Sequence, residues 1–286
     1  MKTLTLNNGR TIPQIGLGVY LASPEDCYDI CCRALEQGFR HIDTAAVYKN
    51  ESAVGRAVRA SKTPRSELFI TTKFILRDND GAKLGLDAAD TRGIVRRHIQ
   101  ECLDRLDLGY IDLLLIHAPF IGKRTDAWRV MEEFVDAGSV RSIGVSNYGV
   151  HHLDELMQIC RIKPVVNQIE LHPFLQNADV VQACKVHGIA VEAYSPIVKV
   201  LHAIPDALKL DDPVVVRVAK ALEKTPAQVL IAWGVCKGYI TLPKTVTPAR
   251  LAVNMDVFFQ IPDQMMRELD ALECGYTTGW DPTRWE

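Results

Sequence analysis

Residues 38–51 read GFRHIDTAAVYKNE, and the rest of the chain is organised around this stretch. A glycine leads into a short apolar run that stops at Asp43, and Tyr48 follows five residues later. A short apolar run bounded by turn residues is typical of a buried strand. The pattern therefore predicts a strand over Phe39–Ile42, followed by a small-residue loop that carries a phenol and opens a helix.

The same placement of an ionisable side chain recurs twice further along the chain. Lys73 follows the strand-like run Leu68–Thr72, and His117 follows Ile111–Ile116. The carboxyl ends of parallel strands meet at one face of a barrel, where active sites form. If these strands are neighbours, an acid, a phenol, an amine and an imidazole converge in one catalytic constellation.

Strand-like and helical patterns alternate along most of the chain. The expected strands are Ile15–Val19, Phe39–Ile42, Leu68–Thr72, Ile111–Ile116, Val140–Val145, Val165–Ile169, Ala190–Ala193 and Tyr239–Leu242. The expected helices cover about 24–37, 50–61, 87–106, 125–137, 150–160, 178–187, 213–236 and 248–257. Most strands are apolar throughout, as parallel strands covered by helices require. Eight such units predict a (β/α)8 TIM barrel, and an open doubly wound sheet is the alternative.

The chain begins with a hairpin pattern. Residues 3–7 and 10–14 flank Asn8-Gly9, a strong signal for a two-residue hairpin turn. We expect this N-terminal β-hairpin to cap one end of the barrel. No linker or low-complexity tract divides the chain, so the sequence predicts a single domain over residues 1–286, with a loop-like tail from Gly275 to Glu286.

Composition limits the function classes. Of 286 residues, 48% are hydrophobic and 24% charged, with formal net charge −2, which suits a globular protein and gives no electrostatic footprint for nucleic acid or an anionic membrane. There is neither a signal-peptide pattern at the start nor an apolar run of about 18 residues. We expect a cytoplasmic monomer. The eight scattered cysteines form no Cys-x-x-Cys pair and are expected to be reduced, and no metal site is expected.

The four ionisable groups suit the polarisation and protonation of a carbonyl while another agent delivers the nucleophile. Tyr48 holds its proton at neutral pH and can donate it. A neighbouring ammonium, Lys73, is expected to lower the pKa of this phenol, while Asp43 keeps the lysine charged and in place. His117 is expected either to orient a carbonyl oxygen or to share in the proton transfer. Taken singly, each residue also has an ordinary structural interpretation, such as a turn cap, a surface tyrosine, a solvated strand end or a core histidine.

These motifs resemble those of the aldo-keto reductase family, along nearly the whole chain. Residues 38–51 resemble the first family signature, and Ile116–Pro119 resembles its Ile-His-Trp-Pro motif, with Ala118 in place of tryptophan. The resemblance implies a barrel closed by an N-terminal hairpin. It also implies that Tyr48 is the general acid and that His117 orients the substrate.

The resemblance also implies a nicotinamide cofactor. The positions similar to the family's cofactor contacts are Ser146, Asn147 and Gln168 for the carboxamide, Tyr194 with Ser195 for the ring, Lys244, Thr245 and Arg250 for the 2′-phosphate, and Asn254 for adenine. A lysine point charge and an arginine fork suit phosphate, so NADPH (NADP+ when oxidised) is expected over NADH. Val253 stands where many members have glutamate, which departs from the family pattern at the adenine end.

The substrate is expected to be a small carbonyl compound in an apolar pocket. The candidate lining residues are Tyr20, Phe74, Phe120 and Trp280. Two rival functions remain open. One is a Schiff-base aldolase that acts through Lys73. The other is a non-catalytic or regulatory NADPH-binding barrel. The sequence contains no Gly-x-Gly-x-x-Gly motif, so it does not support a Rossmann fold.

Overall fold

The structure is a computed structural model, and it describes residues 2–75, 90–119, 124–198 and 209–285. Its centre is an eight-stranded sheet in which the strands follow one another in chain order. The strands are β3 (Leu17–Gly18), β4 (His41–Asp43), β5 (Phe69–Phe74), β6 (Leu113–Ile116), β7 (Ile143–Ser146), β8 (Val166–Glu170), β9 (Ala190–Tyr194) and β10 (Ile240–Leu242). Every pairing between neighbouring strands is parallel.

The two ends of this sheet meet and close it into a barrel. Parallel bridges join Ile15 to Thr241 and Gly18 to Lys244, next to β3 and β10. Gly16 is needed at this seam because a Cβ atom there would lie 2.6 Å from Nδ1 of His41. The predicted TIM barrel is confirmed.

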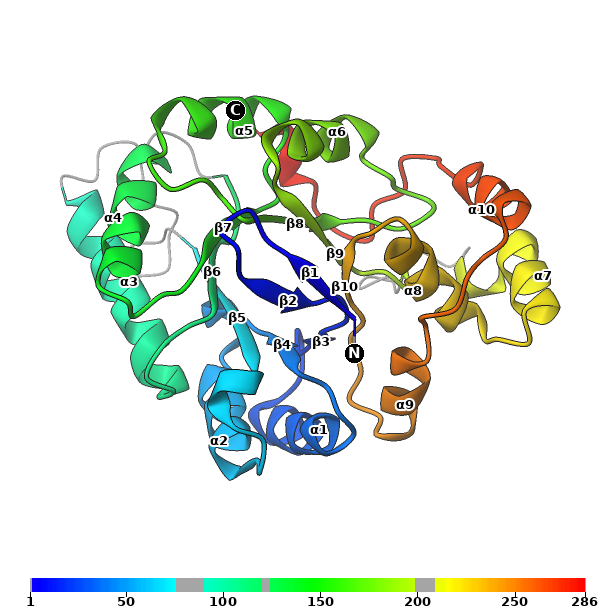
Figure 1. The fold of residues 1–286 in the computed structure, drawn as a ribbon, viewed down its shortest axis with the longest axis horizontal. Coiled ribbons are helices and arrows are strands. Elements are labelled where there is room, and N and C mark those ends of the chain that lie inside the picture. Colours follow the sequence, from blue (N-terminus) through cyan, green and yellow to red (C-terminus); the bar gives the residue numbers. More distant parts are fainter. Residues whose placement is uncertain (1, 76–89, 120–123, 199–208, 286) are drawn as a thin grey trace.

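The helices lie around the outside of the barrel (Figure 1). They are α1 (Pro24–Glu36), α2 (Glu51–Ala60), α3 (Thr91–Leu106), α4 (Arg124–Asp136), α5 (Val150–Ile159), α6 (Ala178–His187), α7 (Pro213–Ala221), α8 (Pro226–Cys236), α9 (Ala249–Met255) and α10 (Asp263–Asp270). Short 3₁₀ turns cover Ala46–Tyr48, Arg65–Glu67, Lys209–Asp211 and Pro282–Arg284. No helix within the described ranges is both long and apolar enough to span a membrane.

Two helix predictions were wrong. The expected helix over 213–236 is two helices, α7 and α8, because Glu223 takes a left-handed backbone (φ 54°) and Thr225 caps a new helix that starts at Pro226. Proline at the first helical position lacks the N–H that a continuing helix would need. The second miss is α10, which the sequence pattern did not predict.

The N-terminal hairpin covers one end of the barrel, as expected. Strands β1 (Thr3–Thr5) and β2 (Thr11–Pro13) lie across the ring of parallel strands in Figure 1. Leu6, which follows β1, and Ile12 in β2 are buried and pack against residues of the barrel strands. The turn is longer than the two residues predicted, because the backbone N–H of Leu6 bonds to the carbonyl of Arg10 and leaves three residues between them.

The hairpin therefore closes the end where the barrel strands begin. The opposite end, where the strands finish, is the end toward which the predicted catalytic side chains are directed. The single-domain prediction for residues 1–286 stays a prediction.

Candidate active site

Three neighbouring strands bring the predicted catalytic residues to the same end of the barrel. Asp43 is the last residue of β4, Lys73 is the penultimate residue of β5, and His117 directly follows β6. Tyr48 ends the 3₁₀ turn that follows β4. The four groups are therefore gathered in space although they span 75 positions of sequence, from 43 to 117.

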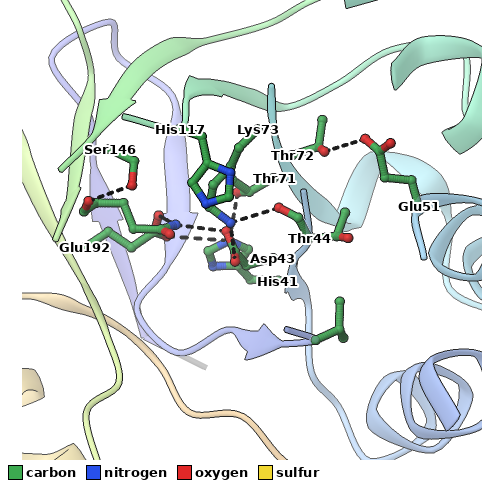
Figure 2. A network of polar contacts seen from close by, with 12 residues as sticks. His41, Asp43, Thr44, Glu51, Thr71, Thr72, Lys73, His117, Ser146 and Glu192 are labelled. Carbon is green, nitrogen blue, oxygen red and sulfur yellow. Dashed lines mark hydrogen bonds and ion pairs between the residues drawn. The ribbon is translucent and has the colours of Figure 1, made fainter. Parts of the chain in front are cut away.

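Lys73 and Asp43 form a buried ion pair. Nζ of Lys73 donates to Oδ1 of Asp43 at 2.6 Å and to the backbone carbonyl of Thr44 at 2.8 Å (Figure 2). Both side chains are removed from water. Burial raises the pKa of Asp43, while the charge and hydrogen bond of Lys73 oppose this rise. The pair thus fixes the lysine beneath the mouth of the barrel, which is the open end where the parallel strands finish.

Tyr48 lies between the lysine and the aromatic side chains of the mouth. Nζ of Lys73 is 5.0 Å from the centroid of the Tyr48 ring, and the rings of Tyr20 and His117 lie 4.8 and 5.7 Å away. The expected lowering of the tyrosine pKa was wrong. Burial raises the pKa of Tyr48 well above its usual value, and the negative charge of Asp43 and the neighbouring Tyr20 add to this rise. The hydrogen bonds of Lys73 go to Asp43 and Thr44, and the charge of the lysine does not overcome this rise.

His117 is held by its backbone on both sides. Its N–H bonds to the carbonyl of Phe74 at 2.9 Å, and its carbonyl accepts a 2.9 Å bond from the side chain of Asn147. The imidazole ring is 9% exposed and lies 6.4 Å from the ring of Trp280. This arrangement leaves the ring at the mouth, beside Tyr48.

A second carboxylate lies below the ion pair, and the sequence analysis missed it. Nε2 of Gln168 donates to Oδ2 of Asp43 at 2.9 Å and to Oε2 of Glu192 at 2.7 Å. Glu192 is fully buried in β9. The available signal was its position inside the apolar run Ala190–Ala193, where a carboxylate is costly unless it has partners.

Asp43, Lys73, Gln168, Glu192 and His41 are in contact with one another and form an inner cluster. Burial changes the protonation of its members. It raises the pKa of Glu192 from 4.5 to about 8, and the charge of Asp43 adds to the effect. It also lowers the pKa of His41 to about 3. His41 is thus neutral at neutral pH, so its 3.7 Å contact with Glu192 is not an ion pair. Instead, Nε2 of His41 lies 3.0 Å from the hydroxyl oxygen of Thr71.

The three predicted carboxamide contacts lie side by side, Ser146 and Asn147 at the end of β7 and Gln168 in the middle of β8. Ser146 and Gln168 are register partners, and the Ser146 hydroxyl donates to the backbone carbonyl of Gln168 at 2.9 Å. Asn147 has a left-handed backbone (φ 61°), and its Oδ1 accepts a 2.9 Å bond from the hydroxyl of Tyr194. Ser195, which follows Tyr194, accepts a hydrogen bond from the Thr278 hydroxyl at 3.3 Å.

The predicted phosphate-binding residues lie after β10 and on α9. Because Gly18 pairs with both Asp43 and Lys244, the lysine sits at the same end of the barrel as the ion pair. Thr245 is buried, and its hydroxyl oxygen accepts a 3.0 Å bond from the backbone N–H of Thr247. Arg250 is exposed near the start of α9, whereas Asn254 is buried in it.

The predicted substrate residues separate into two groups. Tyr20 and Trp280 are 43% and 42% exposed, and they contact Tyr48 and His117 respectively, so both lie at the mouth. Phe74 is fully buried in the core and follows Lys73 in its strand, so it points to the opposite face of the sheet, away from the side chain of Lys73. Phe120 lies outside the described residues.

Comparison with known proteins agrees with this geometry. The sequence profile of the aldo/keto reductase family matches residues 14–273. The chain belongs to the aldo/keto reductase family. It is 42% identical to an uncharacterized oxidoreductase of Schizosaccharomyces pombe, over 98% of this chain and 96% of the relative. It is 37% identical to the glyoxal reductase of Bacillus subtilis, again over 98% and 96% of the two chains.

A solved structure extends this agreement to the fold. The aldo-keto reductase MGS-M4, from a deep-sea metagenome library of the Medee basin, superposes with a TM-score of 0.88 at 35% identity, covering both chains completely. Membership of the aldo/keto reductase family supports carbonyl reduction as the chemistry of this barrel.

Proposed function

We propose that this chain reduces aldehydes or ketones to alcohols with NADPH, and that Tyr48 gives the proton. The observation that carries the proposal is the buried Lys73–Asp43 pair beneath the rings of Tyr48 and His117, at the open end of the barrel. A neutral proton donor beside a fixed ammonium suits the place where a carbonyl oxygen gains negative charge.

The residues present fit a nicotinamide cofactor. Hydroxyl and amide groups of Ser146, Asn147 and Gln168 are adjacent at the mouth, where a carboxamide can exchange hydrogen bonds with them. The cations Lys244 and Arg250 stand on a segment at the same end, where they can bind a 2′-phosphate. When bound, the cofactor supplies the hydride.

The chain's own residues then handle the oxygen. Because the pKa of Tyr48 is raised, the phenol keeps its proton throughout the neutral range. An alkoxide is a stronger base than a phenolate, so it takes this proton readily once it forms. Lys73 lies 5.0 Å from the Tyr48 ring and stabilises the phenolate that is left. His117, at the edge of the same space, donates to or steers the carbonyl oxygen.

Small uncharged carbonyl compounds suit the mouth best. Two exposed aromatic side chains, Tyr20 and Trp280, flank Tyr48 and His117 and offer apolar surface rather than charge. The similarity to relatives named glyoxal reductase and methylglyoxal reductase makes glyoxal and methylglyoxal the first substrates to test.

The aldolase alternative is less well supported. Schiff-base formation requires an amine free to attack a carbonyl, whereas Nζ of Lys73 donates hydrogen bonds to Asp43 and to the backbone carbonyl of Thr44.

The first test of the proposal is cofactor binding by the wild-type chain. Trp280, 6.4 Å from His117, makes tryptophan fluorescence a suitable signal. We expect quenching by NADPH at lower concentration than by NADH, followed by oxidation of NADPH when methylglyoxal is added. Binding without turnover of any aldehyde or ketone would favour a regulatory barrel, and binding of neither cofactor would reject the proposal.

Tyr48→Phe tests the proton donor. The change removes only the hydroxyl, so NADPH affinity should stay within about twofold of wild type, while kcat should fall by roughly 10² to 10⁴, the usual worth of a general acid. The two quantities are measured by fluorescence titration and by steady-state assay. Undiminished kcat in this variant would show that another group supplies the proton.

A further inference from the structure

The side-chain amide of Gln168 is hydrogen-bonded to two acidic side chains, Asp43 and Glu192. Its Nε2 donates to Asp43 at 2.9 Å and to Glu192 at 2.7 Å. A side-chain amide has two N–H donors, so these two bonds use both of them. The partners come from different strands, β4 and β9, on either side of the barrel interior.

This arrangement fixes which end of the amide faces the mouth. Turning the Gln168 amide over would bring its oxygen against two acid groups and would leave Asp43 and Glu192 without a donor at these positions. In the described part of the chain, no group donates to Oε1 of Gln168, so the carbonyl oxygen is the atom left to bind a ligand.

We propose that Glu192 is a positioning residue for the cofactor: with Asp43 it holds the amide of Gln168 so that only a carbonyl oxygen is presented to the nicotinamide carboxamide. The inference rests on the proposed function, in which Gln168 is one of the carboxamide contacts. A carboxamide approaching this oxygen must direct its N–H toward Gln168, and this fixes how the nicotinamide ring is turned.

Glu192 keeps this role in either protonation state. The charged or titratable groups around it are Asp43 and His41 on β4 and Lys73 on β5. With its pKa raised to about 8 by burial, Glu192 retains a proton at neutral pH. A protonated acid still has a carbonyl oxygen, which accepts the bond from Gln168. Asp43 already accepts one N–H of Gln168 at its Oδ2, so the second N–H of the amide depends on Glu192.

The test compares two cofactors with the full chain. The probes are NADP+ and its 3-acetylpyridine analogue, in which a methyl ketone replaces the carboxamide and removes its N–H groups. Wild type should bind the analogue roughly tenfold more weakly, because the oxygen of Gln168 loses its donor. Two variants at Glu192 then follow: Glu192→Leu removes the acceptor at similar size, and Glu192→Gln keeps a carbonyl acceptor.

In Glu192→Leu, one N–H of Gln168 is released and the amide can turn over to donate. NADP+ binding should weaken by roughly tenfold, while analogue binding should stay near its wild-type value. The difference in affinity between the two cofactors (the affinity gap) should therefore disappear. Glu192→Gln should restore the wild-type gap. A purely structural role for Glu192 would lower both affinities by the same factor and would overturn the inference, as would an unchanged gap.

These results are distinguishable from failure of the proposed function. If wild type binds neither NADP+ nor the analogue, the proposed function fails and the inference fails with it. If wild type binds NADP+ and turns over a carbonyl substrate but the gap does not respond to Glu192→Leu, only the inference fails.

Discussion

The inner cluster and the phosphate end of the candidate site are built in opposite ways. In the inner cluster, Asp43, Lys73 and Glu192 are buried and already bonded through side chains of the chain itself. At the phosphate end, Arg250 is exposed on the surface of α9. The inner cluster is held in place without a ligand, whereas the charge of Arg250 at the phosphate end is exposed and accessible to an anionic ligand.

The difference follows from what each region has to do. Charges in a dry interior act strongly on a developing charge, but each must be paired in advance because an isolated buried ion is very costly. A phosphate carries its own charge and can recruit an exposed arginine from water at little cost to folding. Substitutions in the inner cluster should therefore change folding and catalysis together, whereas substitutions at the phosphate end should change binding alone.

The largest effect is expected from Lys73→Met. The change leaves Asp43 as a buried, unpaired acid, and breaking a buried ion pair from one side costs roughly 3 to 5 kcal/mol of unfolding free energy. It also removes the positive charge beside Tyr48, so kcat should fall by at least about a hundredfold. Urea unfolding and steady-state kinetics measure the two losses.

A double variant separates the two consequences. Lys73→Met with Asp43→Asn has no buried charge to leave unpaired, and the asparagine carbonyl can still accept from Gln168. It should recover much of the lost stability while activity stays low. If the double variant were no more stable than Lys73→Met alone, the ion pair would not be what holds this region together.

Arg250→Ala should have a smaller and purely local effect. Losing one charge-assisted hydrogen bond costs about 1.5 to 3 kcal/mol, so the Kd for NADPH should rise roughly tenfold to a hundredfold. The Kd for NADH, which lacks the 2′-phosphate, should not change, and unfolding free energy should stay within about 0.5 kcal/mol of wild type.

Arg10→Ala is the matched control for this charge. Arg10 is also exposed, but it lies in the hairpin at the closed end of the barrel. Its removal changes net charge equally and should leave both affinities unchanged. Equal weakening of NADPH and NADH in Arg250→Ala would remove the phosphate role from this residue.

The sequence predicted the placement of the catalytic groups better than their electrostatics. Asp43, Lys73 and His117 were predictable because each follows an apolar run, and parallel strands deliver such residues to one face. The raised pKa of Tyr48 was not predictable, because it depends on burial and on the nearby charge of Asp43, to which Lys73 is hydrogen-bonded. The spacing of residues in the sequence indicates neither how deeply Tyr48 is buried nor which charges lie beside it.

Two other features escaped sequence reasoning for related reasons. Glu192 interrupts an apolar run only once, and its partners Gln168 and Asp43 come from strands distant in sequence. The division between α7 and α8 was visible in Thr225 and Pro226, a cap followed by a first-turn proline, but continuous apolar periodicity concealed it.

The last of these effects is a dependence of folding on pH that belongs to Glu192, and it is spread over several pH units. Its pKa is 4.5 as an ordinary side chain and about 8 in the folded protein. Between these values the folded chain holds a proton that the unfolded chain has released, so the unfolding free energy falls as pH rises through this window. His41, with a pKa lowered to about 3, has the opposite effect, and its contribution is complete above about pH 6.5.

Glu192→Gln isolates the glutamate contribution, because glutamine has no proton to lose. Between pH 6.5 and 8, the unfolding free energy of wild type should fall more steeply than that of the variant, by at most about 1.4 kcal/mol per pH unit, the slope for one proton. The two curves should become parallel above about pH 8.5. Arg250→Ala, measured in parallel, should follow the wild-type curve, since the phosphate end contains no such group. Parallel curves for wild type and Glu192→Gln across the whole range would mean that the inner cluster holds its charges at less cost than its burial implies.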